Sequence, residues 1–218
     1  MKTTSFGLTS FLTSAALRRA PGHIHDQVKR PLELIFATVG LLLAAPVMLL
    51  CGIIIKLTSK GPVFYVQERL GQNGKPFQMY KLRSMTVDAE TDGPQWCREG
   101  DPRVTPVGRF LRRTHLDELP QLINVARGDM SLIGPRPERP HFVAKLKGAV
   151  PLYTQRLSVR PGVTGLAQVK HHSDQTIEDV QTKLGYDLEY IRRACLFLDL
   201  RILALTAVKV IARRSGRA

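Results

Sequence analysis

The chain has 218 residues, 44% of them hydrophobic, which is enough for one folded domain with a core of its own. Its 32 Lys and Arg against 18 Asp and Glu give a formal net charge of +14, which suits nucleic acid, an anionic membrane surface or phosphorylated substrates without choosing among them. The three cysteines are far apart and form no CxxC pair, which argues against zinc and favours reduced thiols in a protein facing the cytosol.

Residues 1–28 form a segment of their own. Residues 5–17 are mildly apolar but rich in Ser and Thr, and the basic pair Arg18-Arg19 follows them. A secretory signal has the opposite order and ends in a small-residue cleavage site. We expect a mobile or membrane-skimming tail here and assign it no function.

Residues 34–55 carry no charged side chain, and that stretch is long enough for a helix across a bilayer. Pro46 lies near its middle, where a proline removes a backbone hydrogen bond and bends the helix. Both flanks are basic, and the positive-inside rule favours the cytoplasm for both; the residues are Lys29, Arg30, Lys56 and Lys60. A bent, re-entrant helix satisfies both observations. A plain transmembrane span and a buried helix of a soluble protein are the alternatives.

A β-hairpin is predicted next. Residues 62–69 and 75–82 look extended, and Asn73-Gly74 between them favours a tight turn. Residues 83–105 are polar and indicate a loop with a short helix, and residues 109–113 indicate a helical turn. The helix that follows is expected to be capped by Asp117, with Pro120 in its first turn and Gly128 at its end.

The C-terminal half combines rigid turns with helices. Proline-rich turns occupy residues 134–137 and 160–162. Apolar residues recur at helical spacing through residues 174–193, which predicts an amphipathic helix. Residues 196–211 are more apolar and lead into arginines, which suits a membrane interface, and packing onto the core is an equal alternative. Together the elements indicate an α+β fold that is mainly helical.

Two adjacent carboxylates, Asp117 and Glu118, are the first candidates for chemistry. Neighbours in sequence do not face each other across a substrate, so the two-carboxylate geometry of glycosidases does not fit. At a helix start the dipole would favour an ionised Asp117, as a carboxylate nucleophile requires. An ordinary acidic helix cap explains the same residues.

A set of cations lies in segments that turns could bring together: Lys81, Arg83, Arg109, Arg112, Arg113, Arg136 and Arg160. Guanidinium groups bind phosphate oxygens in bidentate fashion. Arg136 stands between two prolines, and a rigid turn can aim its side chain. Taken singly, each of the others fits a solvated basic face. The sequence contains no GxxxxGK[ST], GxGxxG or HExxH motif.

Taken in order, these motifs resemble the bacterial sugar transferases, the small monotopic phosphoglycosyl transferases. The resemblance covers residues 29–211 and rests on Lys29-Arg30 and on residues 55–85, 101–138 and 156–169. Some positions depart from the family pattern, namely Glu33 for Asp, Ala45 for Ser before Pro46, Leu166 for Trp, and Lys170-His171 for Asn-Gly. Ala45 removes a hydroxyl that could satisfy a carbonyl freed by the proline.

The resemblance implies an organisation and a set of roles. A mobile tail (1–28) would precede a re-entrant membrane helix (29–58). A small cytosolic catalytic domain (59–212), with a short β-hairpin and interfacial amphipathic helices, and a basic tail (213–218) would follow. Asp117 would match the nucleophile and Glu118 the residue that binds Mg²⁺. Arg136 would match the contact to the nucleotide sugar, and the other substrate-binding candidates are Lys81, Arg83, Arg112, Arg113 and Arg160.

The implied reaction moves a hexose-1-phosphate from a UDP-sugar to undecaprenyl phosphate, as the first membrane step of exopolysaccharide or glycoconjugate synthesis. Asp117 would attack the sugar-bearing phosphate and release UMP, and the lipid phosphate would then take the phosphosugar. The enzyme would act among membrane lipids at the cytoplasmic face of the bacterial inner membrane, with a homodimer as an option and no nucleic-acid partner. The rivals are a nucleic-acid-binding protein and a non-catalytic membrane scaffold, and neither explains the whole motif set.

Overall fold

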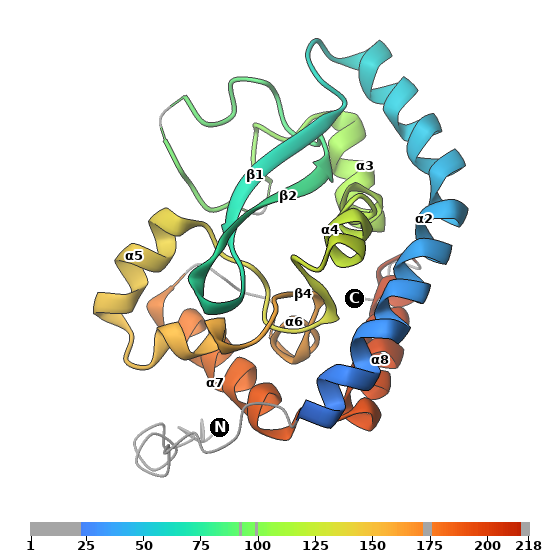
Figure 1. Ribbon diagram of the computed structural model, residues 1–218. Coiled ribbons are helices and arrows are strands. Elements are labelled where there is room, and N and C mark those ends of the chain that lie inside the picture. Colours follow the sequence, from blue (N-terminus) through green and yellow to red (C-terminus); the bar gives the residue numbers. More distant parts are fainter. Residues whose placement is uncertain (1–22, 92, 99, 172–175, 215–218) are drawn as a thin grey trace.

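The computed structural model describes residues 23–91, 93–98, 100–171 and 176–214. Helices dominate, and two small two-stranded sheets lie among them (Figure 1). The expected fold class is confirmed to that extent. The expected tail covers residues 1–28; residues 1–22 lie outside the described residues, as do residues 215–218 of the basic tail, whereas residues 23–28 form the start of a helix.

The helix α2 (His23–Thr58) is continuous through Pro31 and Pro46 and curves along one side of the molecule (Figure 1). The bend expected at Pro46 is a gradual curve of this one continuous helix. One stripe of α2 faces the rest of the protein, whereas its opposite face exposes large apolar side chains such as Leu42 and Leu43. The buried stripe comprises Lys29, Glu33, Ala37, Ala44, Cys51 and Ile55. By length and composition alone, α2 could cross a membrane.

The predicted hairpin is confirmed. Strands β1 (Phe64–Leu70) and β2 (Pro76–Leu82) pair antiparallel from Phe64 opposite Leu82 to Leu70 opposite Pro76. The turn η1 (Gln72–Gly74) needs left-handed backbone at Asn73 and Gly74, which those two residue types tolerate. The connection after β2 is a loop, and its described residues contain no helix.

The segment after that loop differs from the expectation in one respect. Helix α3 (Pro106–Thr114) ends at His115, whose left-handed backbone (φ 57°) turns the chain into a short 3₁₀ turn, η2 (Leu116–Glu118). Helix α4 (Gln121–Arg127) begins only after Pro120 and ends at Gly128, as predicted. The expected start of that helix at Asp117 is wrong, because the left-handed His115 and the fixed backbone of Pro120 give η2 a separate turn.

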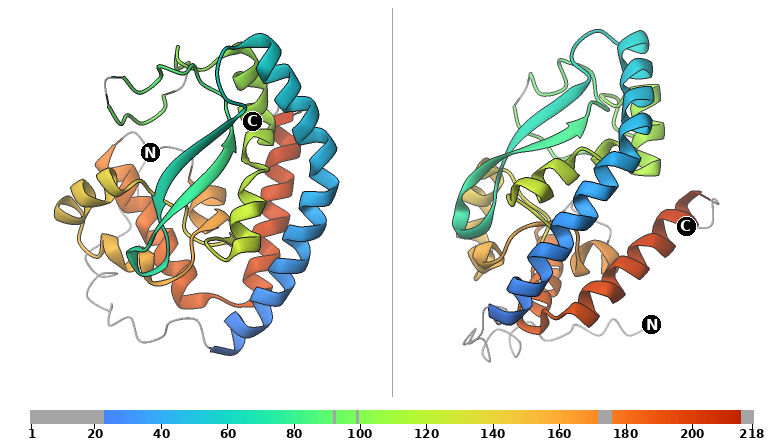
Figure 2. Two further views of the ribbon diagram at one scale, coloured as in Figure 1. Left: turned by 45° about the horizontal axis from the view of Figure 1, so that its top comes forward. Right: turned by 45° about the vertical axis from the view of Figure 1, so that its right-hand side comes forward.

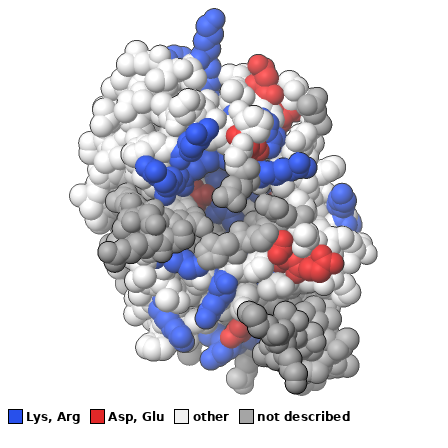
Figure 3. Space-filling model, turned by 180° about the vertical axis from the view of Figure 1, so that it is seen from behind, with Lys and Arg blue, Asp and Glu red and all other residues white. Residues whose placement is uncertain are grey.

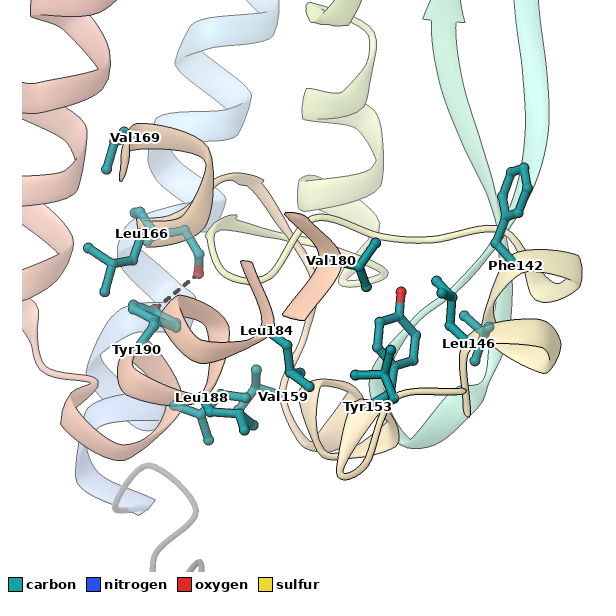
Figure 4. Packing of buried hydrophobic residues seen from close by; sticks show 14 of the residues in the cluster. Phe142, Leu146, Tyr153, Val159, Leu166, Val169, Val180, Leu184, Leu188 and Tyr190 are labelled. Atoms are coloured by element: carbon teal, nitrogen blue, oxygen red, sulfur yellow. Dashed lines mark hydrogen bonds between the residues drawn. The ribbon is translucent and has the colours of Figure 1, made fainter. Parts of the chain in front are cut away.

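The C-terminal half forms the main core. Strand β3 (Ser131–Ile133) pairs in parallel with β4 (Gly162–Thr164), so the two proline-rich turns lie side by side. Helices α5 (Pro140–Ala149), α6 (Leu166–Lys170) and α7 (Ile177–Arg193) and the turn η3 (Tyr153–Ser158) pack around them. Figure 4 shows the buried side chains that these elements contribute. The predicted amphipathic helix is confirmed as α7 from Ile177 on.

The last helix, α8 (Leu196–Arg214), starts beside the start of α2 and then diverges from it (Figure 2). Its buried face holds Asp199 and Ile202, and its outer face exposes Phe197, Leu200 and Val208. Seen from behind, the side of the molecule along α2 carries few charged side chains, while Lys and Arg gather elsewhere on that face (Figure 3). Both helices therefore present apolar surface to the outside.

Candidate active site

The η2 turn carries Asp117 and Glu118 into a cavity of about 520 Å³. Backbone hydrogen bonds from Glu118 N to His115 O and from Leu119 N to Leu116 O close the turn. Further walls come from β1, from β2 and from residues 136–139. Helices α5 and α7 supply an apolar wall with Phe142, Leu146, Val180 and Leu184, four of the side chains labelled in Figure 4.

Glu118 is held in its ionised form by two cations. Lys81 Nζ lies 2.9 Å from Glu118 Oε1, and Arg136 Nη2 donates to the same oxygen. Burial would raise the pKa of Glu118, but the charges of Arg136 and Lys81 outweigh it and hold that pKa well below its usual range. Burial also lowers the pKa of Lys81, an effect that Glu118 opposes. The two cations thus fix Glu118 as a carboxylate.

Asp117 has the opposite surroundings. Only 6% of its surface is exposed, and no hydrogen bond to its carboxylate is present among the described residues. Burial and the neighbouring Glu118 raise its pKa, while Lys81, Arg112 and Arg136 act against that rise. The helix-start position that was expected to favour an ionised Asp117 is not found, because Asp117 lies in η2, one turn before α4 begins; burial and Glu118 raise its pKa instead.

The structure brings some of the predicted cations together and leaves others out. Lys81, Arg83, Arg112 and Arg136 line the cavity. Arg83 is committed to the end of α2, because its guanidinium donates to Ser59 O, Ser59 Oγ and Lys60 O. Arg109 and Arg113 are exposed on α3 and do not line the cavity. Arg160 lies beside a second cavity of about 30 Å³ near the start of α2.

Arginines that sequence reasoning missed hold the Arg136 turn in place. Arg156 donates to Arg136 O at 2.9 Å and to Asp187 Oδ2 at 2.9 Å, and it is buried. Arg69 donates to Pro137 O at 3.0 Å. Two successive carbonyls of the turn, those of Arg136 and Pro137, therefore each accept a hydrogen bond from an arginine. The sequence held one sign of this pair: Asp187 is a carboxylate that lies between Leu184 and Leu188 on the apolar face of α7, where a charged residue needs a partner.

A loop closes one side of the cavity. Glu90 accepts two hydrogen bonds from Arg139, at 2.7 and 2.9 Å, and Trp96 packs against Phe142 with ring centroids 5.1 Å apart. Both loop residues line the cavity. The loop therefore adds an aromatic face and an ion pair to a cavity whose other walls are basic or apolar.

The carboxylates fit a magnesium ion shared with a substrate. Among the described residues there is no group of three or more His, Cys, Asp and Glu side chains that could hold a metal alone. Magnesium is usually held by one or two carboxylates together with substrate phosphates and water. In the same described part, Glu118 Oε2 and the Asp117 carboxylate accept no hydrogen bond. Those oxygens are hard ligands, so the pair fits Mg²⁺ completed by a diphosphate.

A family model described as bacterial sugar transferase matches residues 24–213. The chain belongs to the bacterial sugar transferase family. A relative from Aeromonas hydrophila, a UDP-N-acetylgalactosamine-undecaprenyl-phosphate N-acetylgalactosaminephosphotransferase, is 42% identical over 85% of this chain and 44% of its own length. The UDP-glucose:undecaprenyl-phosphate glucose-1-phosphate transferase of Escherichia coli K12 is 41% identical over 85% of this chain and 40% of its own length.

These two relatives are more than twice as long as the stretch they share with this sugar transferase. A third relative is close to this chain in length. The exopolysaccharide production protein of Rhizobium leguminosarum bv. phaseoli is 38% identical, and the match covers 87% of this chain and 98% of that protein. The matched region contains the whole cavity described above, so the family assignment and the site concern the same part of the chain.

Proposed function

We propose that this sugar transferase moves a hexose-1-phosphate from a UDP-sugar to undecaprenyl phosphate through a phosphosugar bound to Asp117. The observation that carries the proposal is the η2 turn. This turn places Asp117 and Glu118 at the wall of a basic cavity. Lys81 and Arg136 keep Glu118 ionised, whereas the buried Asp117 carboxylate accepts no hydrogen bond in the described structure. The names of the relatives support the donor and acceptor classes, and one of them supports a place in exopolysaccharide production.

In the first step an oxygen of the Asp117 carboxylate attacks the phosphorus that bears the sugar. The bond from that phosphorus to the bridging oxygen breaks, and UMP leaves with the electron pair. In the second step an oxygen of the lipid phosphate attacks the same phosphorus and the bond to Asp117 breaks, which restores the carboxylate. Each step exchanges one P–O bond for another, so no oxidant or further reactant is needed.

The chain's own groups favour these steps by charge and position. Arg136, Lys81 and Arg112 surround the two carboxylates and would offset the charge of the diphosphate. Glu118 and Asp117 would hold Mg²⁺, which supplies further charge neutralisation at the phosphate oxygens when bound. Arg156 and Arg69 keep the Arg136 turn from shifting between the two steps.

The contacts of α2 support a re-entrant placement at the cytoplasmic face of the inner membrane. Near its start, Lys29 donates to Ile133 O, and at its end Arg83 bonds Ser59 and Lys60. Both ends thus contact one polar domain, which cannot lie on both sides of a bilayer at once. Labelling of Asp26→Cys and Lys60→Cys variants, in a Cys97→Ser/Cys195→Ser background, tests this. Periplasmic labelling of either flank would contradict it.

The reaction itself is tested by incubating the full chain in lipid nanodiscs with a panel of UDP-sugars, undecaprenyl phosphate and Mg²⁺. UMP release is the readout. We expect release with one or a few UDP-sugars and its loss in Asp117→Asn. No release with any member of the panel from well-folded protein would overturn the proposal, and salt-sensitive retention of DNA by the same protein would favour the nucleic-acid alternative.

A further inference from the structure

The first turns of α2 are bonded to both segments that form the candidate active site. Lys29 and Arg30, adjacent in sequence, were expected to act as charges that orient the helix in the membrane. In the structure Lys29 is buried, with 8% of its surface exposed, and Arg30 is half-buried. Both side chains point into the protein, and each contacts a different element.

Arg30 holds the end of α4. Its Nη1 donates to Val125 O at 2.5 Å and its Nη2 to Ala126 O at 2.9 Å. Carbonyls in the last turn of a helix lack partners within the helix, and a cation there also complements the helix dipole. Gly128 leaves room for this contact, since an added Cβ would lie 3.2 Å from Arg30 Nη2. Because α4 follows the η2 turn directly, Arg30 fixes the element that carries Asp117 and Glu118.

Lys29 holds β3. Its Nζ donates to Ile133 O at 2.9 Å and to the Tyr190 hydroxyl at 2.8 Å, and it lies 3.1 Å from Asp199 Oδ2. The hydroxyl of Tyr190 also lies 3.1 Å from Ile133 O, the contact drawn as a dashed line in Figure 4. One turn further along α2, Glu33 accepts from Leu132 N at 2.9 Å and from the Ser131 hydroxyl. All three residues of β3 are therefore bonded to this network.

Strand β3 leads within three residues to Arg136, the partner of Glu118. The two branches thus meet again at the Arg136–Glu118 ion pair. One branch runs from Arg30 through α4, and the other runs from Lys29 through β3. Buried polar networks of this kind add little net stability compared with well-packed apolar residues, but they fix relative positions, because each group has few alternative partners.

We infer that Lys29 and Arg30 are positioning residues that hold the Arg136 turn and the Asp117–Glu118 turn at a fixed spacing from the membrane helix. The inference rests on the proposed function for the kinetic part of its test. It assigns the basic pair a second task besides any effect on membrane orientation: the geometry of the site is tied to the way α2 lies against the domain.

The test uses the full chain in nanodiscs and three variants. Arg30→Gln removes the α4 contact. Tyr190→Phe weakens the β3 network while keeping Lys29, whose removal would leave Asp199 and Glu33 buried without their cation. Lys56→Gln is the matched control, because it removes a positive charge from the exposed far end of the same helix. Thermal unfolding and the folded fraction are measured for each.

Two readouts distinguish positioning from simple stability. Arg30→Gln should lower kcat on the order of tenfold with little change in KM, because it disturbs the turn that bears the nucleophile. Tyr190→Phe should instead raise KM for the UDP-sugar severalfold, because it disturbs the Arg136 turn. Amide hydrogen exchange in residues 115–120 should quicken in the first variant and in residues 131–137 in the second, and Lys56→Gln should change neither.

The outcomes separate this inference from the proposed function. If the wild type releases no UMP, the proposed function fails, and the exchange data alone judge the positioning. If the folded variants match the control in kinetics and in exchange, or lose activity only in proportion to their folded fraction, the inference is overturned.

Discussion

On one side of the η2 turn, Glu118 shares an oxygen between Lys81 and Arg136, and its pKa is held low. On the other side, one residue earlier, Asp117 meets the cavity with no such partner among the described residues, and its pKa is raised. Both residues carry a carboxyl group, and both lie on the same backbone turn. The difference comes from the elements that reach each of them, since β2 and the Arg136 turn converge on Glu118 and leave Asp117 open to substrate.

This contrast suggests a division of labour. A carboxylate already bonded by two cations is a poor nucleophile but a stable electrostatic and metal-binding partner. A carboxylate that lacks such partners keeps its reactive oxygens, and Lys81, Arg112 and Arg136 nearby favour its ionised form. Variants that replace each carboxylate by its amide separately test this difference between Asp117 and Glu118.

The largest effect is expected for Asp117→Asn. An amide cannot form the acyl phosphate, so turnover should fall by about three orders of magnitude or more in a protein that remains folded. Steady-state UMP release measures this, with circular dichroism as the control for folding. Retention of a tenth of the wild-type turnover would show that Asp117 is not the nucleophile.

Glu118→Gln should come next, with turnover reduced on the order of 10²-fold, because Lys81 and Arg136 lose their common carboxylate and Mg²⁺ loses a ligand. The Mg²⁺ concentration needed for half-maximal rate should rise as well. A titration of rate against Mg²⁺ checks both numbers. An unchanged Mg²⁺ requirement would remove Glu118 from the metal's ligands.

A smaller effect should separate two neighbouring arginines. Arg112 lines the cavity and donates to Ser84 Oγ at 2.8 Å, whereas Arg113 is exposed and does not line the cavity. Arg112→Gln should lower kcat/KM on the order of tenfold, since one charge near the diphosphate is lost, and Arg113→Gln should change it less than about twofold. Equal effects would mean that the cavity does not bind the diphosphate.

The smallest effect concerns stability. A helix cap at position 117 would make Asp117→Asn lose about 1 kcal/mol or less, since Asn caps nearly as well as Asp. The structure predicts a gain instead at neutral pH. Because the folded pKa of Asp117 is raised, the charged side chain disfavours folding above that pKa, and this penalty disappears as pH falls to the unfolded carboxyl value of about 3.9. Denaturant unfolding of both proteins at neutral and at acidic pH measures the difference, and a loss at neutral pH would restore the cap.

The sequence was informative where the signal is local. Asn73-Gly74 predicted the hairpin, and the spacing of apolar residues predicted α7, because turn chemistry and helical periodicity act within a few residues. The start of α4 was mispredicted, because a histidine adopts the left-handed backbone only in a minority of cases, so His115 alone does not signal the turn that separates η2 from α3. Boundaries of this kind depend on what the turn packs against.

The sequence predicted which types of residue form the candidate site, but not which individual arginines belong to it. Asp117, Glu118, Lys81, Arg112 and Arg136 do converge on one cavity, while Arg113 and Arg160 do not. Whether an arginine faces a cavity depends on tertiary packing that charge alone does not encode. The Arg156–Asp187 pair and the inward contacts of Lys29 and Arg30 join segments far apart in the chain, and single-sequence patterns do not reveal such pairings.

The nucleophilic role of Asp117 is tested most directly by leaving out the lipid acceptor. Wild-type protein in nanodiscs is incubated with the preferred UDP-sugar and Mg²⁺, and UMP and the mass of the Asp117 peptide are measured together. The account predicts UMP at the stoichiometry of the enzyme, a phosphosugar adduct on the peptide that contains Asp117, and release of that adduct on addition of undecaprenyl phosphate. UMP that forms only when lipid is present, with no adduct at any time, would contradict it and indicate direct transfer between the two substrates.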